Sequence, residues 1–383
     1  MDIGEFDFIG RLRKAFPDIG ADALGIGDDC AVIRFSSGGF SSGDPACGTS
    51  GAAGLTPGSE LLVSTDLLLE GVHFLLDAIT PWQLGWKAAA VNLSDIAAMG
   101  GRPRWTFLSI ALPKGEAASR KGIPPIDAAW ADAFIAGYKA VSDRFGVKLL
   151  GGDTSASLRD LCINVAVLGE CPAGKAVLRS AARPGDLICV SGTLGDSAAG
   201  LRLSIPQGKG LRSKEPIPQG FGLSESEARI QYLLKSHFEP VPRVELGQEL
   251  REMRGMGAMM DLSDGLASDV RHILKASGEA TGGELGAEID VSSLPLSDEL
   301  KAVCKEKGWD PVSLALEGGE DYELLFTCRP DAVLPRYFDT PLSETPSGDG
   351  CAPVPLTVVG RVTDTPGVVW KGSERDYHGF THF

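Results

Sequence analysis

Acidic side chains follow small residues at seven places along the chain. They lie in the stretches GIGDD, VSTD, NLSD, GGDT, LGDS, DLSDG and GGEDYE. Because Asp and Gly are common turn residues, a solvated turn explains any one of these stretches. Seven of them beside apolar segments instead predict that acids at the ends of buried strands and helices converge on one site.

The segment KAAAVNLSDIAAMGG (87–101) is the most informative of the seven. Apolar residues surround Asp95 on all sides, which predicts a buried helix. A buried carboxylate costs several kcal/mol unless it is paired. A structural ion pair with Lys87, two helical turns earlier, is one alternative. A metal ion is favoured because the other acids need the same cation.

Two further stretches offer oxygen ligands. Ser64, Thr65 and Asp66 in VSTD end a predicted strand and suit Mg²⁺ or Ca²⁺, with an ordinary turn as the alternative. In DLSDG, Asp261 ends an apolar strand and Asp264 follows three residues later. A helix N-cap alone would explain Asp264 but would leave Asp261 without a role.

Glycines suggest where a phosphate could bind. VKLLGGDTSAS is predicted to run from a strand into a loop, and within it Gly151 and Gly152 precede Asp153 and would let backbone N–H groups approach a phosphate closely. GECPAGKA (169–176) is close to a P-loop, but Ala176 lacks the hydroxyl for Mg²⁺ and Pro172 lacks a backbone donor. We therefore reject the P-loop interpretation.

The acids also indicate which cation would bind. Two carboxylates 4 Å apart repel by about 4 kcal/mol at an effective dielectric constant of ~20. No His or Cys cluster is present, so hard divalent ions are favoured. Mg²⁺ prefers a few carboxylates together with water and substrate phosphates. The pattern predicts an enzyme that acts on a polyphosphate with the help of Mg²⁺.

Composition limits the class of protein. The chain has 383 residues, which favours two domains, and it is 43% hydrophobic and 23% charged. A net charge of −15 without a basic patch argues against nucleic acid or an anionic membrane as partner. The start MDIGEFDFIG is no signal peptide, and the eight Cys form no C-x-x-C pair. These features predict a cytoplasmic protein with reduced thiols.

Strands and helices are mixed along the chain, which predicts an α/β (α+β) protein with two lobes divided near residue 174. One helix should begin at Pro81, with Thr80 and Gln83 as its capping box, and end at Gly100. A second helix should cover 128–145. Polar, Gly-rich stretches predict surface loops at 36–58, 205–228 and 343–353.

The chain closely resembles the thiamine-monophosphate kinase family, in the superfamily that includes aminoimidazole ribonucleotide synthetase. The matching stretches are GEFDFIGRL, GIGDDCAVI, STDLLLEGVHF, KAAAVNLSDIAAMG, GGDT, RSAARPGDLICVSGTLGDSAAGL, HFEPVPRVELG, DLSDGLASDV, GGEDYELLFT and GFTHF. They occur in order from the first residues to the last, which makes the resemblance far more specific than any single motif.

The resemblance implies a fold, a reaction and a site. It implies a two-domain fold of mixed sheets flanked by helices, with 1–174 binding ATP and metal and forming a homodimer, and 175–383 completing the substrate site. The reaction is Mg²⁺-assisted, in-line transfer of the ATP γ-phosphoryl group to thiamine phosphate. The implied metal ligands are Asp29, Ser64, Thr65, Asp66, Asp95, Asp153, Asp261 and Asp264; the implied ATP contacts are Gly152, Asp153, Arg179 and Ser263; and the implied thiamine phosphate contacts are His73, Glu320 and Phe380.

Two alternatives remain open at this stage. One is another ATP-dependent synthetase of the superfamily, of the purine cyclo-ligase type, although GGEDYELLF and GFTHF resemble the kinase. The other is a nucleotide-binding protein without catalysis, which would not need so many metal ligands. The lack of a base–nucleophile pair fits a kinase, because a phosphate monoester with a second pKa near 6 is already ionised and nucleophilic.

Overall fold

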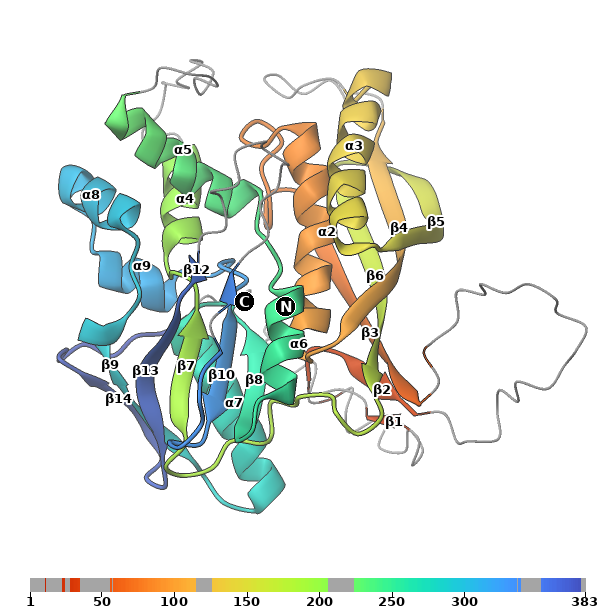
Figure 1. Cartoon of the computed structure of the whole chain (residues 1–383). Helices are drawn as coiled ribbons and strands as arrows, with labels where there is room; N and C mark the ends of the chain where they lie inside the picture. The colour runs from red at the N-terminus through yellow and green to blue at the C-terminus, as the bar shows by residue number, and fades with distance from the viewer. Residues whose placement is uncertain are drawn as a thin grey trace, which may run out of the picture.

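The computed structural model describes residues 23–24, 28–34, 58–114, 126–205, 224–335, 337–338 and 353–379, and the single positions 11 and 56. These residues form two six-stranded sheets and a two-stranded ribbon, with helices between and around them (Figure 1). The predicted α/β class, with mixed sheets flanked by helices, is confirmed. Most of the loops predicted at 36–58 and 343–353 lies outside the described residues, as does Phe380.

The first sheet is built from the N-terminal part of the chain. Its strands are β1 (Ala23–Leu24), β2 (Ala31–Ile33), β3 (Ser59–Leu69), β4 (Arg102–Pro113), β5 (Lys148–Ser157) and β6 (Cys162–Pro172), in the order β1-β2-β3-β6-β4-β5. Only β4 and β5 pair in parallel. β5 is therefore an edge strand, separated from β3 by β6 and β4.

The second sheet is built from the remainder of the chain. Its strands are β7 (Leu187–Ser191), β8 (Met256–Asp261), β9 (Gly286–Asp290), β10 (Leu324–Cys328), β13 (Leu356–Thr363) and β14 (Gly367–Lys371), in the order β14-β9-β13-β7-β10-β8. β11 (Tyr337–Phe338) and β12 (Pro353–Val354) form the separate ribbon. The edge strand β8 ends at Asp261, so one of the predicted site acids lies at the boundary of this sheet.

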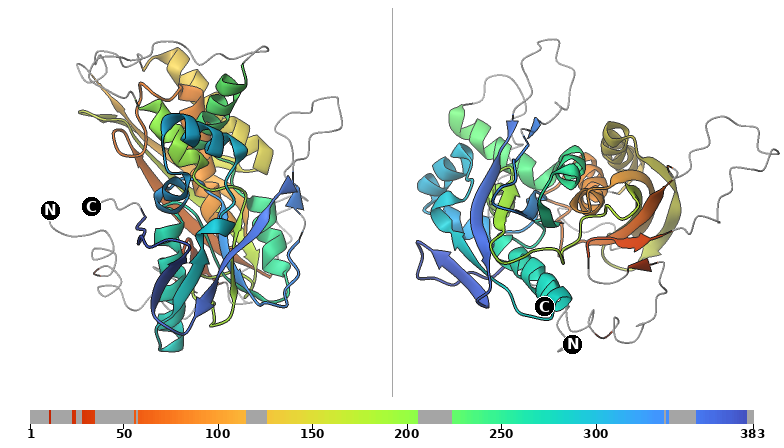
Figure 2. Two further views of the ribbon diagram at one scale, coloured as in Figure 1. Left: turned by 90° about the vertical axis from the view of Figure 1, so that its left-hand side faces the viewer. Right: turned by 60° about the horizontal axis from the view of Figure 1, so that its bottom comes forward.

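The helices connect the two sheets. They are α2 (Pro81–Ala98), α3 (Ala128–Phe145), α4 (Asp196–Ser204), α5 (Glu225–Phe238), α6 (Val244–Glu252), α7 (Leu266–Thr281), α8 (Asp298–Lys307) and α9 (Pro311–Glu317), with the 3₁₀ turn η2 (Val291–Ser293). α2 contacts β3 and β6 of the first sheet and β8 of the second, and thus lies between them (Figure 1). α7 packs on the second sheet, while α4, α5, α8 and α9 form a separate group (Figure 2).

Local sequence determines where α2 begins and ends. Thr80 caps the helix, its hydroxyl accepts from the Gln83 N–H, and the Gln83 side chain completes the capping box as predicted. Pro81 occupies the first turn, where its missing N–H costs nothing. Most of the helix is buried all round, including Asn92, Ser94 and nearly all of the Ala and Leu side chains. The predicted buried helix is confirmed.

The apolar stripe predicted on the helix after DLSDG is also confirmed. Leu266, Val270, Ile273 and Leu274 of α7 are all buried, in a core shared with strands of the second sheet. The largest hydrophobic core extends from α2 and α3 through β6 to β10, so it joins side chains of both sheets. The second helix was predicted at its observed bounds, 128–145.

Two loop predictions are wrong in part. GGDT was expected in a loop after a strand, but it lies inside β5, which continues to Ser157 because it pairs with β4 along its whole length. The loop predicted at 205–228 ends earlier, because Ser224 caps α5 and forms a capping box with Glu227. In the described ranges, no helix combines the length and the apolar character needed to cross a membrane.

Glycines set the close approach of α2 and α3. A Cβ on Gly137 would lie 1.8 Å from the Trp82 carbonyl oxygen, and one on Gly85 would lie 2.0 Å from that of Phe134. The two helix backbones therefore touch where no side chain intervenes.

We expect Gly137→Ala to lower the free energy of unfolding by about 1–3 kcal/mol, because the added methyl group forces the helices apart. Thermal and urea denaturation measure the change. Gly283→Ala is the matched control, since its Cβ meets no atom within 4 Å. Equal stability of the two variants would contradict the close contact.

Candidate active site

Three carboxylates, two of them buried and one partly buried, converge from different parts of the chain. Asp29 follows the link from β1, Asp95 lies on α2, and Asp261 ends β8, yet one oxygen of each lies within 4.8 Å of the others. Asp66, on β3, is close enough to influence the pKa of Asp95 and Asp261. The structure thus brings together four acids that the sequence predicted as metal ligands.

Neighbouring donors compensate part of this negative charge. The Ser64 hydroxyl donates to Asp95 Oδ2 at 2.5 Å, and the Ser94 hydroxyl donates to Asp261 Oδ2 at 2.6 Å. Arg179 forms a two-pronged ion pair with Asp29 through Nε and Nη2. A single arginine balances one carboxylate, so the other acids still need a cation.

The ionisation of these acids reflects burial and mutual repulsion. Burial, followed by the charge of Asp29, raises the pKa of Asp66 to about 6 and that of Asp261 to about 8. Burial and the charges of Asp66, Asp261 and Asp29 raise the pKa of Asp95 well above its usual value. Burial disfavours the Arg179 cation, but Asp29 outweighs this effect and raises the arginine pKa. Divalent cation binding would favour the ionised acids.

Asp28, next to Asp29, has a different role. Its Oδ1 accepts a 2.6 Å hydrogen bond from the Arg179 backbone N–H. Burial, more than any other cause, raises its pKa. The side chain therefore joins two distant backbone segments, while Asp29 takes the guanidinium.

The acids open onto a cavity of about 560 Å³. Ten of the predicted site residues line it: Asp29, Ser64, Asp66, His73, Asp95, Arg179, Asp261, Ser263, Asp264 and Glu320. Leu67, Leu68 and Val72 add apolar wall. One part of the cavity is therefore lined by acids, and another part is lined by apolar side chains that could contact a ring.

Other predicted residues lie away from this cavity. Thr65 is exposed and its hydroxyl donates to the Val165 carbonyl. Gly152 and Asp153 are exposed on the edge strand β5, three strand spacings from β3, which is roughly 14 Å. A single chain does not bring them to the other acids. Phe380 lies outside the described residues, and its assignment remains a prediction.

In the GGEDYE segment, Glu320 and Asp321 contact different partners. Glu320 Oε1 lies 3.0 Å from Lys87 Nζ, and its Oε2 lies 3.3 Å from His237 Nδ1. Asp321 accepts hydrogen bonds from the Gly195 and Ser197 N–H groups at the start of α4. The alternative that Lys87 pairs with Asp95 is therefore wrong, because the lysine forms its ion pair with Glu320.

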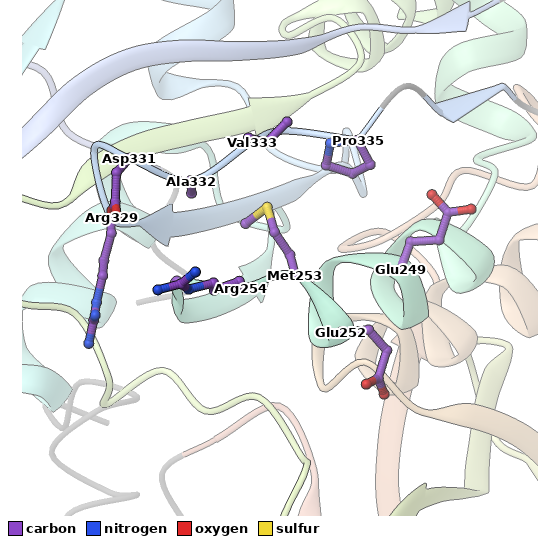
Figure 3. A pocket seen from close by; sticks show the side chains of 10 residues that line it. Glu249, Glu252, Met253, Arg254, Arg329, Asp331, Ala332, Val333 and Pro335 are labelled. Carbon is purple, nitrogen blue, oxygen red and sulfur yellow. The ribbon is translucent and has the colours of Figure 1, made fainter.

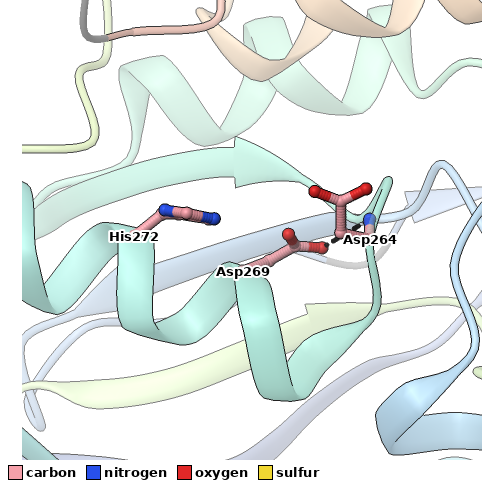
Figure 4. Close-up of side chains that lie close together, drawn as sticks. All are labelled: Asp264, Asp269 and His272. Carbon is pink, nitrogen blue, oxygen red and sulfur yellow. Dashed lines mark hydrogen bonds between the residues drawn. The ribbon is translucent and has the colours of Figure 1, made fainter. Parts of the chain in front are cut away.

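A second acidic group adjoins the first at the start of α7. Ligand atoms of Asp264, Asp269 and His272 lie within 4.8 Å of one another (Figure 4). Asp264 does not cap α7; its N–H instead donates to Asp269 Oδ2 at 3.2 Å. Asp269 is fully buried, and its Oδ1 has no hydrogen-bond partner among the described residues.

Sequence reasoning missed Asp269 and His272. Their spacing of three residues places them on one face of a helix, which was an available signal. Burial, followed by the charge of Asp264, raises the pKa of Asp269 well above its usual value, and burial lowers the pKa of His272 to about 4. Both groups line the 560 Å³ cavity and could support a cation at Asp264.

A further cavity of about 390 Å³ lies beside the end of α6 and the segment after β10 (Figure 3). Its walls include Glu249, Arg254, Arg329 and Val333. None of the predicted site residues lines it, so the candidate active site is the larger, acidic cavity.

Comparison with known proteins agrees with this site. Residues 27–171 match the family model described as AIR synthase related protein, N-terminal domain. The N-terminal part of the chain thus resembles the N-terminal domain of AIR-synthase-related proteins. Thiamine-monophosphate kinases from Escherichia coli K12 and Aquifex aeolicus are 35% and 32% identical, each over 100% of this chain and 99% of the relative. This chain belongs to the thiamine-monophosphate kinase family, which confirms the resemblance found in the sequence.

Solved structures lead to the same family. AaThiL complexed with AMPPCP and TMP superposes with a TM-score of 0.72 at 30% identity, covering 99% of this chain and 97% of that one. The thiamine-monophosphate kinase from Stenotrophomonas maltophilia gives a TM-score of 0.63 at 32% identity, covering 98% and 99%. The similarity therefore includes both sheets and the cavity between them.

We expect the protein without divalent ions to lose stability as pH rises from about 4 to about 8. Asp261 has a folded-state pKa of about 8 and an unfolded value near 3.9, so the folded state binds more protons in this range. Stability is therefore present at the lower pH and is lost as pH rises through the folded-state pKa. Melting temperatures in a chelator, and again with Mg²⁺, measure the effect; Mg²⁺ should stabilise more at the higher pH.

Asp261→Asn should flatten this pH profile, whereas Asp298→Asn, at a 97% exposed side chain, should retain it. The comparison separates Asp261 from buried thiols such as Cys30, whose pKa is also raised by burial. Identical slopes in the wild type and Asp261→Asn would contradict the assignment.

Proposed function

We propose that this protein transfers the γ-phosphoryl group of ATP to thiamine phosphate and so forms thiamine diphosphate. The observation that carries the proposal is one cavity lined by the acids Asp29, Asp95 and Asp261 and by the predicted acceptor contacts His73 and Glu320. Membership of the thiamine-monophosphate kinase family supports the same reaction.

We propose Mg²⁺ as the cation because the donor set fits it. Carboxylates and hydroxyls supply hard oxygen ligands, and the three close acids would repel one another in their ionised forms. Asp29, Asp66, Asp95 and Asp261 would hold ions at the first cluster, with Ser64 beside them, and Asp264 would serve the second. When bound, Mg²⁺ neutralises phosphate charge and aligns the transferring group.

The protein's own residues contribute charge and position. The Arg179 guanidinium, fixed by Asp29, lines the cavity and suits a phosphate by its planar set of donors. Ser263 lies in the turn beside the acids and offers a hydroxyl. The acceptor phosphate is largely ionised near neutral pH, so no general base is required. Catalysis then rests on positioning and electrostatic stabilisation.

We also propose a homodimer formed through the first sheet. The large apolar side chains Leu67, Phe107, Leu149 and Leu150 on β3, β4 and β5 are 40–57% exposed. Such a face is unusual on a monomer and is typical of an interface. In such a dimer, the exposed residues Thr65, Gly152 and Asp153 of one chain would lie near the site of the other chain and could complete it.

We also propose a division of the chain into two parts and a location in the cell. A division near residue 174 would separate a metal- and ATP-binding part from a substrate-completing part, since β6 ends at Pro172 and β7 begins at Leu187. A cytoplasmic location suits an ATP-dependent enzyme, and the cysteines within the described ranges form no disulfide.

The activity is tested with purified protein, ATP and thiamine phosphate, with thiamine diphosphate as the measured product. Turnover should require Mg²⁺ and stop in a chelator. Asp95→Asn should reduce kcat by about 100-fold or more, because an amide is a poor Mg²⁺ ligand. Asp298→Asn, at an exposed position, is the matched control and should keep the wild-type rate.

Three results would change the assignment. A wild-type rate in Asp95→Asn would refute its role as a metal ligand. ADP release with an aminoimidazole precursor but not with thiamine phosphate would favour a synthetase. Tight Mg-ATP binding without any product would favour a binding protein.

The dimer is tested by Leu150→Asp, which places a charge on the proposed interface. Sedimentation should show a dimer for the wild type and a monomer for this variant. Val333→Asp is the control, because Val333 is 85% exposed on a different surface. A wild-type monomer, or a dimer that survives Leu150→Asp, would rule out this interface.

A further inference from the structure

Glu320 is held by two side chains that lie behind the cavity wall. Lys87 Nζ is 3.0 Å from Oε1 and His237 Nδ1 is 3.3 Å from Oε2. Lys87 and His237 are 1% and 3% exposed, whereas the Glu320 side chain is 24% exposed and lines the cavity. The Glu320 carboxylate thus faces the cavity on one side and the buried Lys87 ammonium group on the other.

Lys87 has no other acid to neutralise. Within the described residues, its ammonium group lies within 4 Å of no carboxylate except Glu320, and it makes no hydrogen bond of good geometry. A buried ammonium group without a counter-charge is strongly unfavourable. Lys87 therefore holds the Glu320 carboxylate as its counter-charge. His237 is oriented in turn, because its Nδ1 also lies 3.1 Å from the Ser197 hydroxyl.

The backbone fixes Glu320 in the same direction. Its φ is +64° and that of Tyr322 is +51°, both in the left-handed region that non-glycine residues rarely adopt. The Glu320 N–H donates to the Ser263 carbonyl at 2.8 Å, and the Tyr322 N–H donates to the Leu262 carbonyl at 2.9 Å. Such conformations persist where surrounding contacts enforce them, and they cluster at binding sites.

We propose that Lys87 and His237 are positioning residues that hold the Glu320 carboxylate and aim it into the cavity, where it selects an acceptor with a cationic or amino-bearing heterocycle. This inference rests on the proposed function, since thiamine phosphate carries a cationic thiazolium ring and an aminopyrimidine. ATP would not depend on this carboxylate, because its phosphates belong with the metal-binding acids. The two substrates should therefore respond differently when Lys87 is changed.

Lys87→Met tests the proposal, because methionine nearly fills the lysine volume without its charge. We expect the KM for thiamine phosphate to rise about tenfold or more, as a charge-assisted contact is lost. The KM for ATP and kcat should change by less than about twofold. Lys139→Met is the matched control, since Lys139 is 66% exposed on α3 and pairs only with the nearby Asp143 among described residues.

A double-mutant cycle shows whether Lys87 acts through Glu320. Glu320→Gln alone should raise the KM for thiamine phosphate, and adding Lys87→Met to it should raise the KM little further. Additive effects would overturn the proposal, as would an unchanged KM or equal changes for both substrates. Should Lys87→Met fail to fold in a thermal melt, His237→Phe carries the test, with the same selective rise expected.

Calorimetry with thiamine phosphate separates this inference from the proposed function. A wild type that binds thiamine phosphate without phosphorylating it would refute the activity alone, and the variants would still be compared by Kd. A wild type that turns over, with Lys87→Met indistinguishable from it, would refute the positioning role alone. A wild type that does neither would refute both.

Discussion

Repulsion between carboxylates in a buried space is the constraint on which the rest of the structure depends. Asp29, Asp95 and Asp261 come from three separate elements, and each is buried or nearly so. Two serine hydroxyls and one arginine compensate part of their charge. The proposed Mg²⁺ ions would neutralise the negative charge that remains, and substrate phosphates would complete their coordination.

The helix α2 links the acids of the site to both sheets. α2 packs against both sheets, and its side chains serve two regions of the site. Near its C-terminal end, Ser94 donates a hydrogen bond to Asp261 and Asp95 lies close to Asp29 and Asp261. Lys87, earlier in the helix, forms an ion pair with Glu320. Because α2 is buried on nearly all sides, a shift of this helix would move both Asp95 and the Lys87 partner of the Glu320 carboxylate.

Local signals made part of this predictable. The capping box of Thr80 and Gln83 determines where α2 starts, and the apolar surroundings of Asp95 indicate a buried carboxylate. Partners from distant segments were not predictable: a spacing of two helical turns made Asp95 a plausible partner for Lys87, but in the fold Lys87 pairs with Glu320, which is 233 residues away in the sequence. The strand position of Asp153 was missed for a similar reason, since pairing with β4 overrode the two glycines before it.

The turns DLSDG and GGEDYE join the two regions of the site into one unit. A Cβ on Gly319 would lie 2.2 Å from the Ser263 carbonyl oxygen, and one on Gly265 would lie 2.8 Å from that of Gly318. Backbone hydrogen bonds from Glu320 and Tyr322 close the same contact. Because the two turns are in direct contact, the position of DLSDG constrains the left-handed conformation of Glu320. The geometry that orders the acids therefore also sets the direction of the carboxylate that faces the acceptor.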